Sequence, residues 1–114
     1  MKRILFLDVR NATRSQIAEA WFNQLAGGYG QAQSCGTMPA NAIDARAVQV
    51  MLEVGLDLHA KSPKRVSQQA LAQADIVVLM GKDIQPHAFK SAHVWEFKDL
   101  AGERVEQRLA RMLL

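Results

Sequence analysis

The sequence predicts a single α/β domain over residues 1–114, in which about four parallel strands are flanked by helices on both faces, giving three layers. Two short apolar runs, Ile4–Leu7 and Ile76–Leu79, carry hydrophobic side chains at successive positions, which is typical of parallel strands buried on both faces. Helical patterns alternate with these runs, and neither repeats nor low-complexity linkers interrupt them. The length suits one domain with a single core.

The other elements are predicted from apolar periodicity bounded by capping residues and glycines. The pattern of the first helix runs from Ser15 to Leu25 and stops at Gly27 and Gly28. The remaining segments are strands over residues 31–35 (the weaker pattern) and 93–97, and helices over 44–55 with Asp44 as N-cap, 66–73 capped by Ser67 or a residue just before it, and 105–112.

Composition and charge exclude several classes of protein. Hydrophobic residues make up 49% and charged residues 22%, as in an ordinary soluble domain, and a net charge of +3 is too small for a nucleic-acid binder. The basic run Lys61–Arg65 is interpreted as a solvated loop. No stretch has the length of a membrane span, and no signal peptide is visible. With Cys35 as the single cysteine, which allows no internal disulfide, the sequence predicts a cytoplasmic protein.

The loop after the first strand is the predicted site, because sheets of this kind bind ligands at the carboxyl ends of their strands. It reads D-V-R-N-A-T-R-S, from Asp8 to Ser15, and leads into a helix whose N-terminus adds about half a positive charge. Arg14 supplies a planar fork for two oxygens of a tetrahedral oxyanion, and Asn11 tolerates the left-handed backbone of a tight turn. From the loop alone, the alternative is a connector in which Ser15 caps the helix and Arg14 is solvated. The predicted oxyanion-binding residues are Val9, Arg10, Asn11, Ala12, Thr13, Arg14 and Ser15.

The segment I-L-F-L-D-V-R-N-A-T-R-S-Q-I-A-E-A resembles the opening of the low-molecular-weight tyrosine phosphatases and thioredoxin-coupled arsenate reductases. That family opens with a strand followed by the pattern C-x-x-x-x-x-R-S. The likeness covers nearly the whole chain and continues in order through S-C-G-T-M-P-A, N-A-I-D-A-R-A-V-Q-V-M-L-E-V-G-L-D-L, A-D-I-V-V-L-M-G and V-W-E-F-K-D-L-A-G. The resemblance implies the predicted fold and favours the oxyanion loop over the connector.

The departures from the family concern its catalytic groups. The resemblance places Asp8 where the family has its nucleophilic cysteine. The family's general acid, a late aspartate before a proline, corresponds to Asp99, which is followed here by Leu100. The further cysteines that pass electrons onward in arsenate reductases are missing, and Cys35 is interpreted as a packed small side chain. The loop positions that match the family are Asn11, Arg14 and Ser15.

Three functional hypotheses follow. The first is a protein that keeps the oxyanion loop without a cysteine nucleophile and binds a phosphate-like oxyanion or a phosphorylated partner without turnover. The second is an active phosphatase or arsenate reductase with Asp8 as an altered nucleophile, because aspartate accepts phosphoryl groups in other folds. The third is a structural or regulatory subunit in which Asp8 fills the loop as an internal anion, with a pKa below its ordinary value. No metal spacing is visible, so neither a metal nor a cofactor is predicted, and no pattern specifies an oligomeric state.

Overall fold

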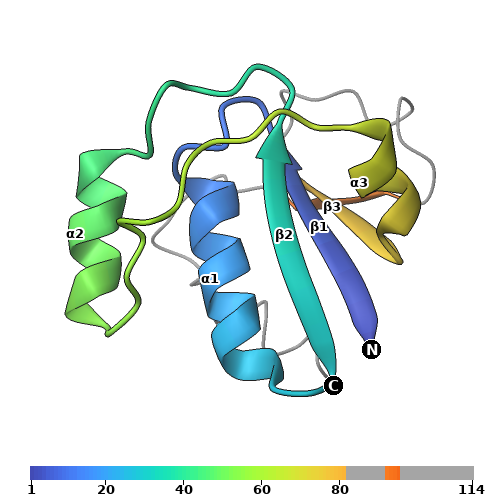
Figure 1. Cartoon of the computed structure of the whole chain (residues 1–114), viewed down its shortest axis with the longest axis horizontal. Helices are drawn as coiled ribbons and strands as arrows, with labels where there is room; N and C mark the ends of the chain where they lie inside the picture. Colours follow the sequence, from blue (N-terminus) through green and yellow to red (C-terminus); the bar gives the residue numbers. More distant parts are fainter. Residues whose placement is uncertain (82–91, 96–114) are drawn as a thin grey trace.

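The computed structural model describes residues 1–81 and the backbone of residues 92–95. Within these residues, four parallel strands form one sheet in the order β2-β1-β3-β4. Figure 1 shows α1 to the left of the sheet, α3 to its right and α2 beyond α1. The elements are β1 (Lys2–Asp8), α1 (Arg14–Ala26), β2 (Gly30–Gly36), α2 (Ala45–Glu53), α3 (Gln68–Gln73), β3 (Ile76–Met80) and β4 (Ala92–Trp95).

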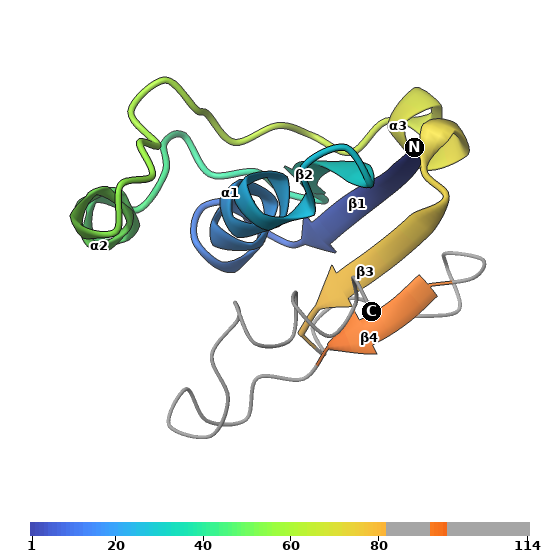
Figure 2. The same ribbon diagram turned by 90° about the horizontal axis from the view of Figure 1, so that it is seen from below.

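The central strand β1 is hydrophobic at successive positions because both of its faces are covered. Phe6 packs with Phe22 of α1 on one face, and their ring centroids lie 6.2 Å apart. Leu7 packs on the other face with Cys35 and Leu79, beneath α3 and Val66. Figure 2 shows α1 and α3 on opposite sides of the sheet. The predicted α/β fold with helices on both faces of a parallel sheet is therefore confirmed.

The register brings the carboxyl ends of three strands together at one edge of the sheet. Asp8 at the end of β1 is paired with Gly36 at the end of β2, and Leu7 is paired with Leu79 in β3. The loop between β1 and α1 lies at this edge, where ligands are bound in parallel sheets of this kind. The predicted loop therefore lies at the carboxyl edge of the sheet, as expected from the sequence.

The capping residues explain where the short helices begin. The Asp44 carboxylate accepts a hydrogen bond from the N–H of Arg46 (2.9 Å), and the Ser67 hydroxyl accepts one from the N–H of Ala70 (3.0 Å). Both predicted caps are confirmed, and each satisfies a donor that the first turn of a helix leaves unpaired. The strand expected at residues 93–97 spans 92–95, and the helix expected at residues 105–112 lies outside the described residues.

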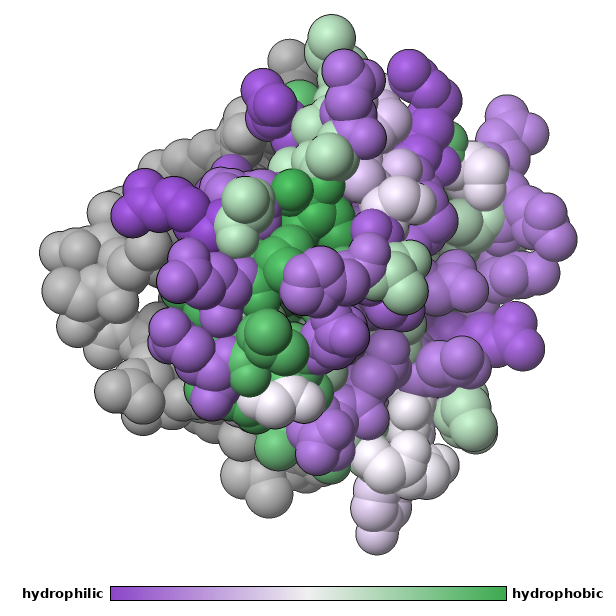
Figure 3. Space-filling view, turned by 60° about the vertical axis from the view of Figure 1, so that its left-hand side comes forward, coloured by the Kyte–Doolittle hydropathy of each residue, from purple (hydrophilic) through white to green (hydrophobic). Residues whose placement is uncertain are grey.

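The described surface is mostly polar. Figure 3 shows polar residues over most of one face, with a band of hydrophobic residues near its middle. In the part of the chain that the structure describes, we find no helix with the length and apolar character needed to cross a membrane.

Candidate oxyanion-binding site

The loop from Asp8 to Arg14 joins the end of β1 to the start of α1 through a tight turn. Asn11 adopts a left-handed backbone with a φ of 50°, a conformation that asparagine tolerates better than most residues. The turn passes so close to β2 that only glycine fits at position 36. A Cβ atom built on Gly36 would lie 2.5 Å from the carbonyl oxygen of Val9. The left-handed turn was predicted from the sequence, whereas the requirement for Gly36 was missed.

Four carbonyl groups of the loop accept hydrogen bonds from the segment that follows β2. The Asp8 carbonyl oxygen accepts from the N–H of Thr37 (3.0 Å), and the Val9 carbonyl oxygen accepts from the N–H of Met38 (2.8 Å). The carbonyl oxygens of Arg10 and Ala12 accept in the same way, each at 2.9 Å, from the N–H groups of Ala40 and Asp44. These hydrogen bonds fix the backbone of the loop against the segment that follows β2.

A carboxylate of the chain itself lies on the inner side of the loop. Asp8 is 4% exposed, and its Oδ1 atom accepts from the N–H of Asn11 at 2.7 Å. Its Oδ2 atom accepts from the N–H of Ser15 at 3.3 Å, and the Ser15 side chain also hydrogen-bonds this carboxyl group. Ser15 is therefore a buried residue inside α1 that faces Asp8, and the alternative in which it caps the helix is wrong.

Burial has the largest effect on the pKa of Asp8. Removal from water raises the pKa of its carboxyl group above the ordinary value, because the charged form is poorly solvated inside the protein. The Ser15 side chain, the N–H groups of Asn11 and Ser15, and the charge of Arg14 all lower this pKa, but together they do not offset burial. The expectation that an internal anion at this position would have a lowered pKa is therefore wrong in sign.

Asn11 holds the loop through its side chain as well as its backbone. Its Nδ2 atom donates to Ser15 Oγ (2.8 Å), while its Oδ1 atom accepts from the N–H of Lys64 (2.9 Å) and from Gln16 Nε2 (3.0 Å). Gln16 Nε2 also approaches the carbonyl oxygen of Ser62 at 3.2 Å. Asn11, Ser15 and Gln16 are all fully buried, so these hydrogen bonds rigidify the turn.

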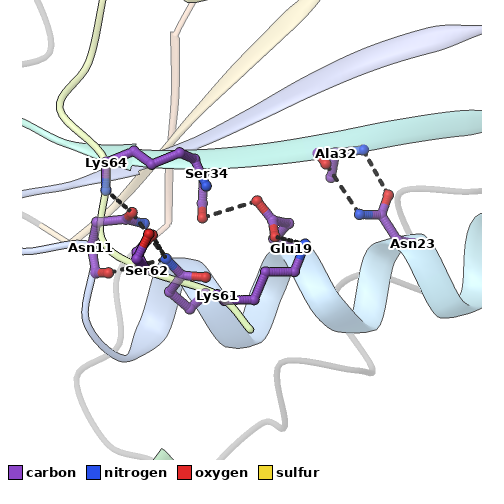
Figure 4. Close-up of polar contacts among 9 residues, drawn as sticks. Asn11, Glu19, Asn23, Ala32, Ser34, Lys61, Ser62 and Lys64 are labelled. Carbon is purple, nitrogen blue, oxygen red and sulfur yellow. Dashed lines mark hydrogen bonds and ion pairs between the residues drawn. The ribbon is translucent and has the colours of Figure 1, made fainter. Parts of the chain in front are cut away.

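The basic run Lys61–Arg65 is more than the solvated loop that the sequence analysis expected. Its backbone bonds to the end of β2, where the N–H of Gly36 donates to the carbonyl oxygen of Lys64 (2.7 Å) and the N–H of Val66 donates to that of Gly36 (2.9 Å). The Lys61 ammonium lies 3.4 Å from a carboxylate oxygen of the buried Glu19. Figure 4 shows this run crossing the first turns of α1, beside Asn11 and Glu19. The signal missed in the sequence is that the polar residues Gln16 and Glu19 lie on the buried face of α1.

The inner side of the loop opens into a small cavity of about 140 Å³. The structure thus brings the predicted loop residues together at one site, with Asn11 and Ser15 buried beneath it. Asp99, the expected general acid, lies outside the described residues. Among the residues that are described, no group of three His, Cys, Asp or Glu side chains is placed to hold a metal ion. The cavity is lined by Asp8, Val9, Arg10, Ala12, Thr13 and Arg14.

Comparison with known proteins assigns the family. A model of the low-molecular-weight phosphotyrosine protein phosphatases matches residues 3–108. The chain belongs to this family. An arsenate reductase of Staphylococcus epidermidis is 34% identical over 108 residues, which cover 90% of this chain and 81% of the relative. An arsenate reductase of Staphylococcus aureus is 31% identical over the same shares of both chains.

Solved structures of the family share the fold. The thioredoxin-dependent arsenate reductase of Corynebacterium glutamicum superposes with a TM-score of 0.83 at 28% identity, covering 99% of this chain and 60% of that chain. A low-molecular-weight protein tyrosine phosphatase from T. tengcongensis has a TM-score of 0.73 at 24% identity, covering 99% of this chain and 92% of that chain. The family resemblance inferred from the sequence is confirmed.

Proposed function

We propose that this chain recognises a phosphate-like oxyanion, free or carried by a phosphorylated partner, without the cysteine-based turnover of its family. The observation that carries this proposal is the Asp8 carboxyl group, which we place at the position of the family's nucleophilic cysteine. It lies at the end of β1 and accepts hydrogen bonds from one N–H group of the loop and one of the first turn of α1. The loop therefore holds a carboxyl group through backbone donors, which are the donors that bind oxyanions at helix N-termini.

The single thiol of the chain supports this proposal. Cys35 lies in β2 and is buried against aliphatic side chains of β1 and β3, and burial raises its pKa to about 11. The nucleophilic form of cysteine is the thiolate, which is scarce near neutral pH at such a pKa. Cys35 is therefore a packing residue, in agreement with its interpretation from the sequence.

Asp8 is poorly placed to act as a replacement nucleophile. Both of its carboxylate oxygens already accept hydrogen bonds, which reduces the electron density available for attack. Two unit charges about 4 Å apart, at an effective dielectric of about 20, repel by about 4 kcal/mol, and a phosphate dianion would meet this repulsion twice. A charged Asp8 therefore opposes the approach of the substrate that it would have to attack.

A second function is favoured by the same contacts. The 2.7 Å hydrogen bond between Asp8 Oδ1 and the N–H of Asn11 is what an internal anion would make. In a structural or regulatory subunit this carboxylate would close the loop permanently, and no external oxyanion would bind. The two functions differ in their response to added phosphate.

The proposal predicts that the purified protein hydrolyses aryl phosphates no faster than an Arg14→Ala variant, and that it does not reduce arsenate with thioredoxin. The reason is the absence of a reactive thiolate and the engagement of Asp8. Steady-state hydrolysis of an aryl phosphate and a coupled arsenate assay check both statements. Turnover well above Arg14→Ala that disappears in Asp8→Asn would replace this proposal with the altered-nucleophile enzyme.

Thermal unfolding separates the binding protein from the structural subunit. A ligand that binds only the folded state at about 100 times its Kd stabilises a protein by about 2.7 kcal/mol. We expect inorganic phosphate to raise the Tm of the wild type and to have a smaller effect on Arg14→Ala. An unchanged Tm in both proteins would support the structural subunit instead.

A further inference from the structure

Resting on the proposed function, we propose that the loop takes up a tetrahedral oxyanion together with one proton, which is carried by Asp8. Asp8 is then a competitor built into the site: in its charged form it keeps external oxyanions out, and in its neutral form it admits them.

The geometry shows why the charged carboxylate and an external anion compete. The N–H groups of Asn11 and Ser15 converge on the two oxygens of Asp8, at 2.7 and 3.3 Å. The same carboxyl group also lines the cavity that the loop encloses. An oxyanion in this cavity would lie against a carboxylate that has already recruited two of the donors on which such sites depend. A neutral carboxyl group turns one oxygen into a donor, so that repulsion becomes a hydrogen bond.

The surroundings of Asp8 make the neutral form accessible. The carboxyl group is almost fully buried, and the described part of the chain places no ammonium or guanidinium group against it except Arg14 of α1. Cys35 of β2 packs in the cluster under α3, and burial raises the pKa of its thiol, which keeps it neutral near physiological pH. Burial of Asp8 accordingly raises its own pKa, in spite of the opposing hydrogen bonds and the charge of Arg14.

The other charged groups around the loop lie farther out. The exposed Arg10 lines the cavity and stays charged at acidic and neutral pH, because a guanidinium group is not deprotonated in proteins. Asp44 accepts from Thr13 Oγ1 at 3.4 Å and caps α2, on the outer side of the loop. The charge of Lys64 lowers the pKa of Cys35, whereas the charge that lowers the pKa of Asp8 is that of Arg14. Asp8 is therefore the group at the cavity whose protonation is expected to respond to an incoming anion.

Sulfate is the probe that isolates this proton. Unlike phosphate, sulfate remains a dianion between about pH 5 and about pH 8, the range in which native proteins tend to be most stable. Any proton taken up on binding must then go to the protein. Calorimetric titration in two buffers with different ionisation enthalpies counts these protons, and the same titrations yield the Kd.

We expect the sulfate affinity of the wild type to fall about tenfold for each pH unit above the pKa of Asp8, because one proton is linked to binding. Close to one proton should be taken up per sulfate in that range. Asp8→Asn should bind sulfate with no proton uptake and no fall with pH, since its amide is always neutral. Asp57→Asn removes the same charge from an exposed turn after α2 and should behave as the wild type does.

The outcomes distinguish this inference from the function on which it rests. Sulfate binding that requires Arg14 but is independent of pH, with no proton uptake by the wild type, would overturn the inference and leave the oxyanion site standing. Proton uptake that persists in Asp8→Asn would also overturn it. If neither the wild type nor Asp8→Asn binds sulfate at any pH, the proposed function fails with it. The proton count on the wild type alone decides the question if Asp8→Asn does not fold.

Discussion

Asp8 and Cys35 lie near the ends of the neighbouring strands β1 and β2, but their side chains have different surroundings. Cys35 pairs with Leu7 in the ladder between β1 and β2, and its side chain joins the aliphatic cluster under α3. Asp8 follows one residue later in β1, and its side chain receives the N–H donors at the start of α1. A thiol in the position of Asp8 would meet a helix N-terminus and Arg14, the surroundings that lower a cysteine pKa.

We therefore predict that Asp8→Cys hydrolyses aryl phosphates measurably, with a phosphocysteine that can be trapped by rapid quench. The substitution supplies a nucleophile and removes the carboxylate repulsion from the cavity. Adding Asp99→Asn should lower the rate by roughly a hundredfold or more, the scale of general acid catalysis. The comparison of the single and double variants in one steady-state assay checks both roles.

Failure of Asp8→Cys would be informative in two ways. With phosphate bound in the loop of a crystal, inactivity would place the defect at Asp99 and Leu100, the positions that the sequence resemblance assigns to the family's general acid and the proline after it. With no anion bound, inactivity would mean that the loop has lost its affinity for oxyanions, which would contradict the proposed function.

At the scale of elements, the loop is held between two segments that are distant in sequence. Residues 37–44 bond to its carbonyl oxygens, and residues 61–66 bond to Asn11 and to both backbone groups of Gly36. Gly36 lies where all three segments meet, and it has no room for a side chain. The shape of the anion site therefore depends on the packing of these segments as much as on the loop sequence.

Gly36→Ala should destabilise the protein by about 1–3 kcal/mol, the usual effect of forcing an extra methyl group into a packed site. Its Cβ atom would lie 2.5 Å from the Val9 carbonyl oxygen and 3.1 Å from the backbone nitrogen of Asn11. Urea unfolding measures the loss. Gly28→Ala is the matched control, because nothing lies within 4 Å of the added Cβ atom.

An unfolding free energy of Gly36→Ala equal to that of Gly28→Ala would show that the loop moves away from β2 at no cost. The close packing of the loop against Gly36 would then not determine the shape of the site.

At the scale of the whole molecule, the described residues include two buried acidic side chains, Asp8 and Glu19, beside the first turns of α1. Glu19 accepts a hydrogen bond from Ser34 (3.1 Å) and lies 3.4 Å from the Lys61 ammonium, which is about half exposed. Asp8 has the N–H groups of Asn11 and Ser15, the Ser15 side chain and the charge of Arg14. The stability of the fold should therefore depend on pH in a way that Asp8 controls.

Because burial raises the folded pKa of Asp8 above the unfolded value of about 3.9, the folded protein holds this proton more tightly. The contribution to the unfolding free energy is present below the unfolded pKa and is lost as pH rises through the folded pKa. We predict that Asp8→Asn lacks this decline and is at least as stable as the wild type near neutral pH. Urea unfolding of both proteins across the pH range measures the difference.

Asp57→Asn should show the opposite sign. The N–H of His59 (2.9 Å) and then its side chain lower the pKa of the exposed Asp57, so any contribution of Asp57 to the unfolding free energy is present above its unfolded pKa and lost as pH falls.

The prediction for Asp8 would be contradicted if Asp8→Asn were less stable than the wild type at neutral pH and lost less stability in acid. Backbone donors would then outweigh burial at Asp8.

The sequence by itself determined most of the fold and the place of the site. Apolar runs such as Ile4–Leu7 marked the strands, Asp44 and Ser67 marked helix starts, and Asn11 marked the left-handed turn. These features depend on residues that are close in the chain, where periodicity and capping act. The family pattern around Asp8 added the expectation of an oxyanion loop.

Only the tertiary structure decided the direction of the Asp8 pKa shift and the contacts that hold the loop. The direction of the Asp8 pKa depends on how much water the packed sheet and α1 exclude, and a list of nearby donors does not contain that quantity. The need for Gly36 and the role of residues 61–66 arise from contacts between segments far apart in the chain. Burial and long-range contact are properties of the assembled fold, so they were decided when the strands, the helix and the loop came together.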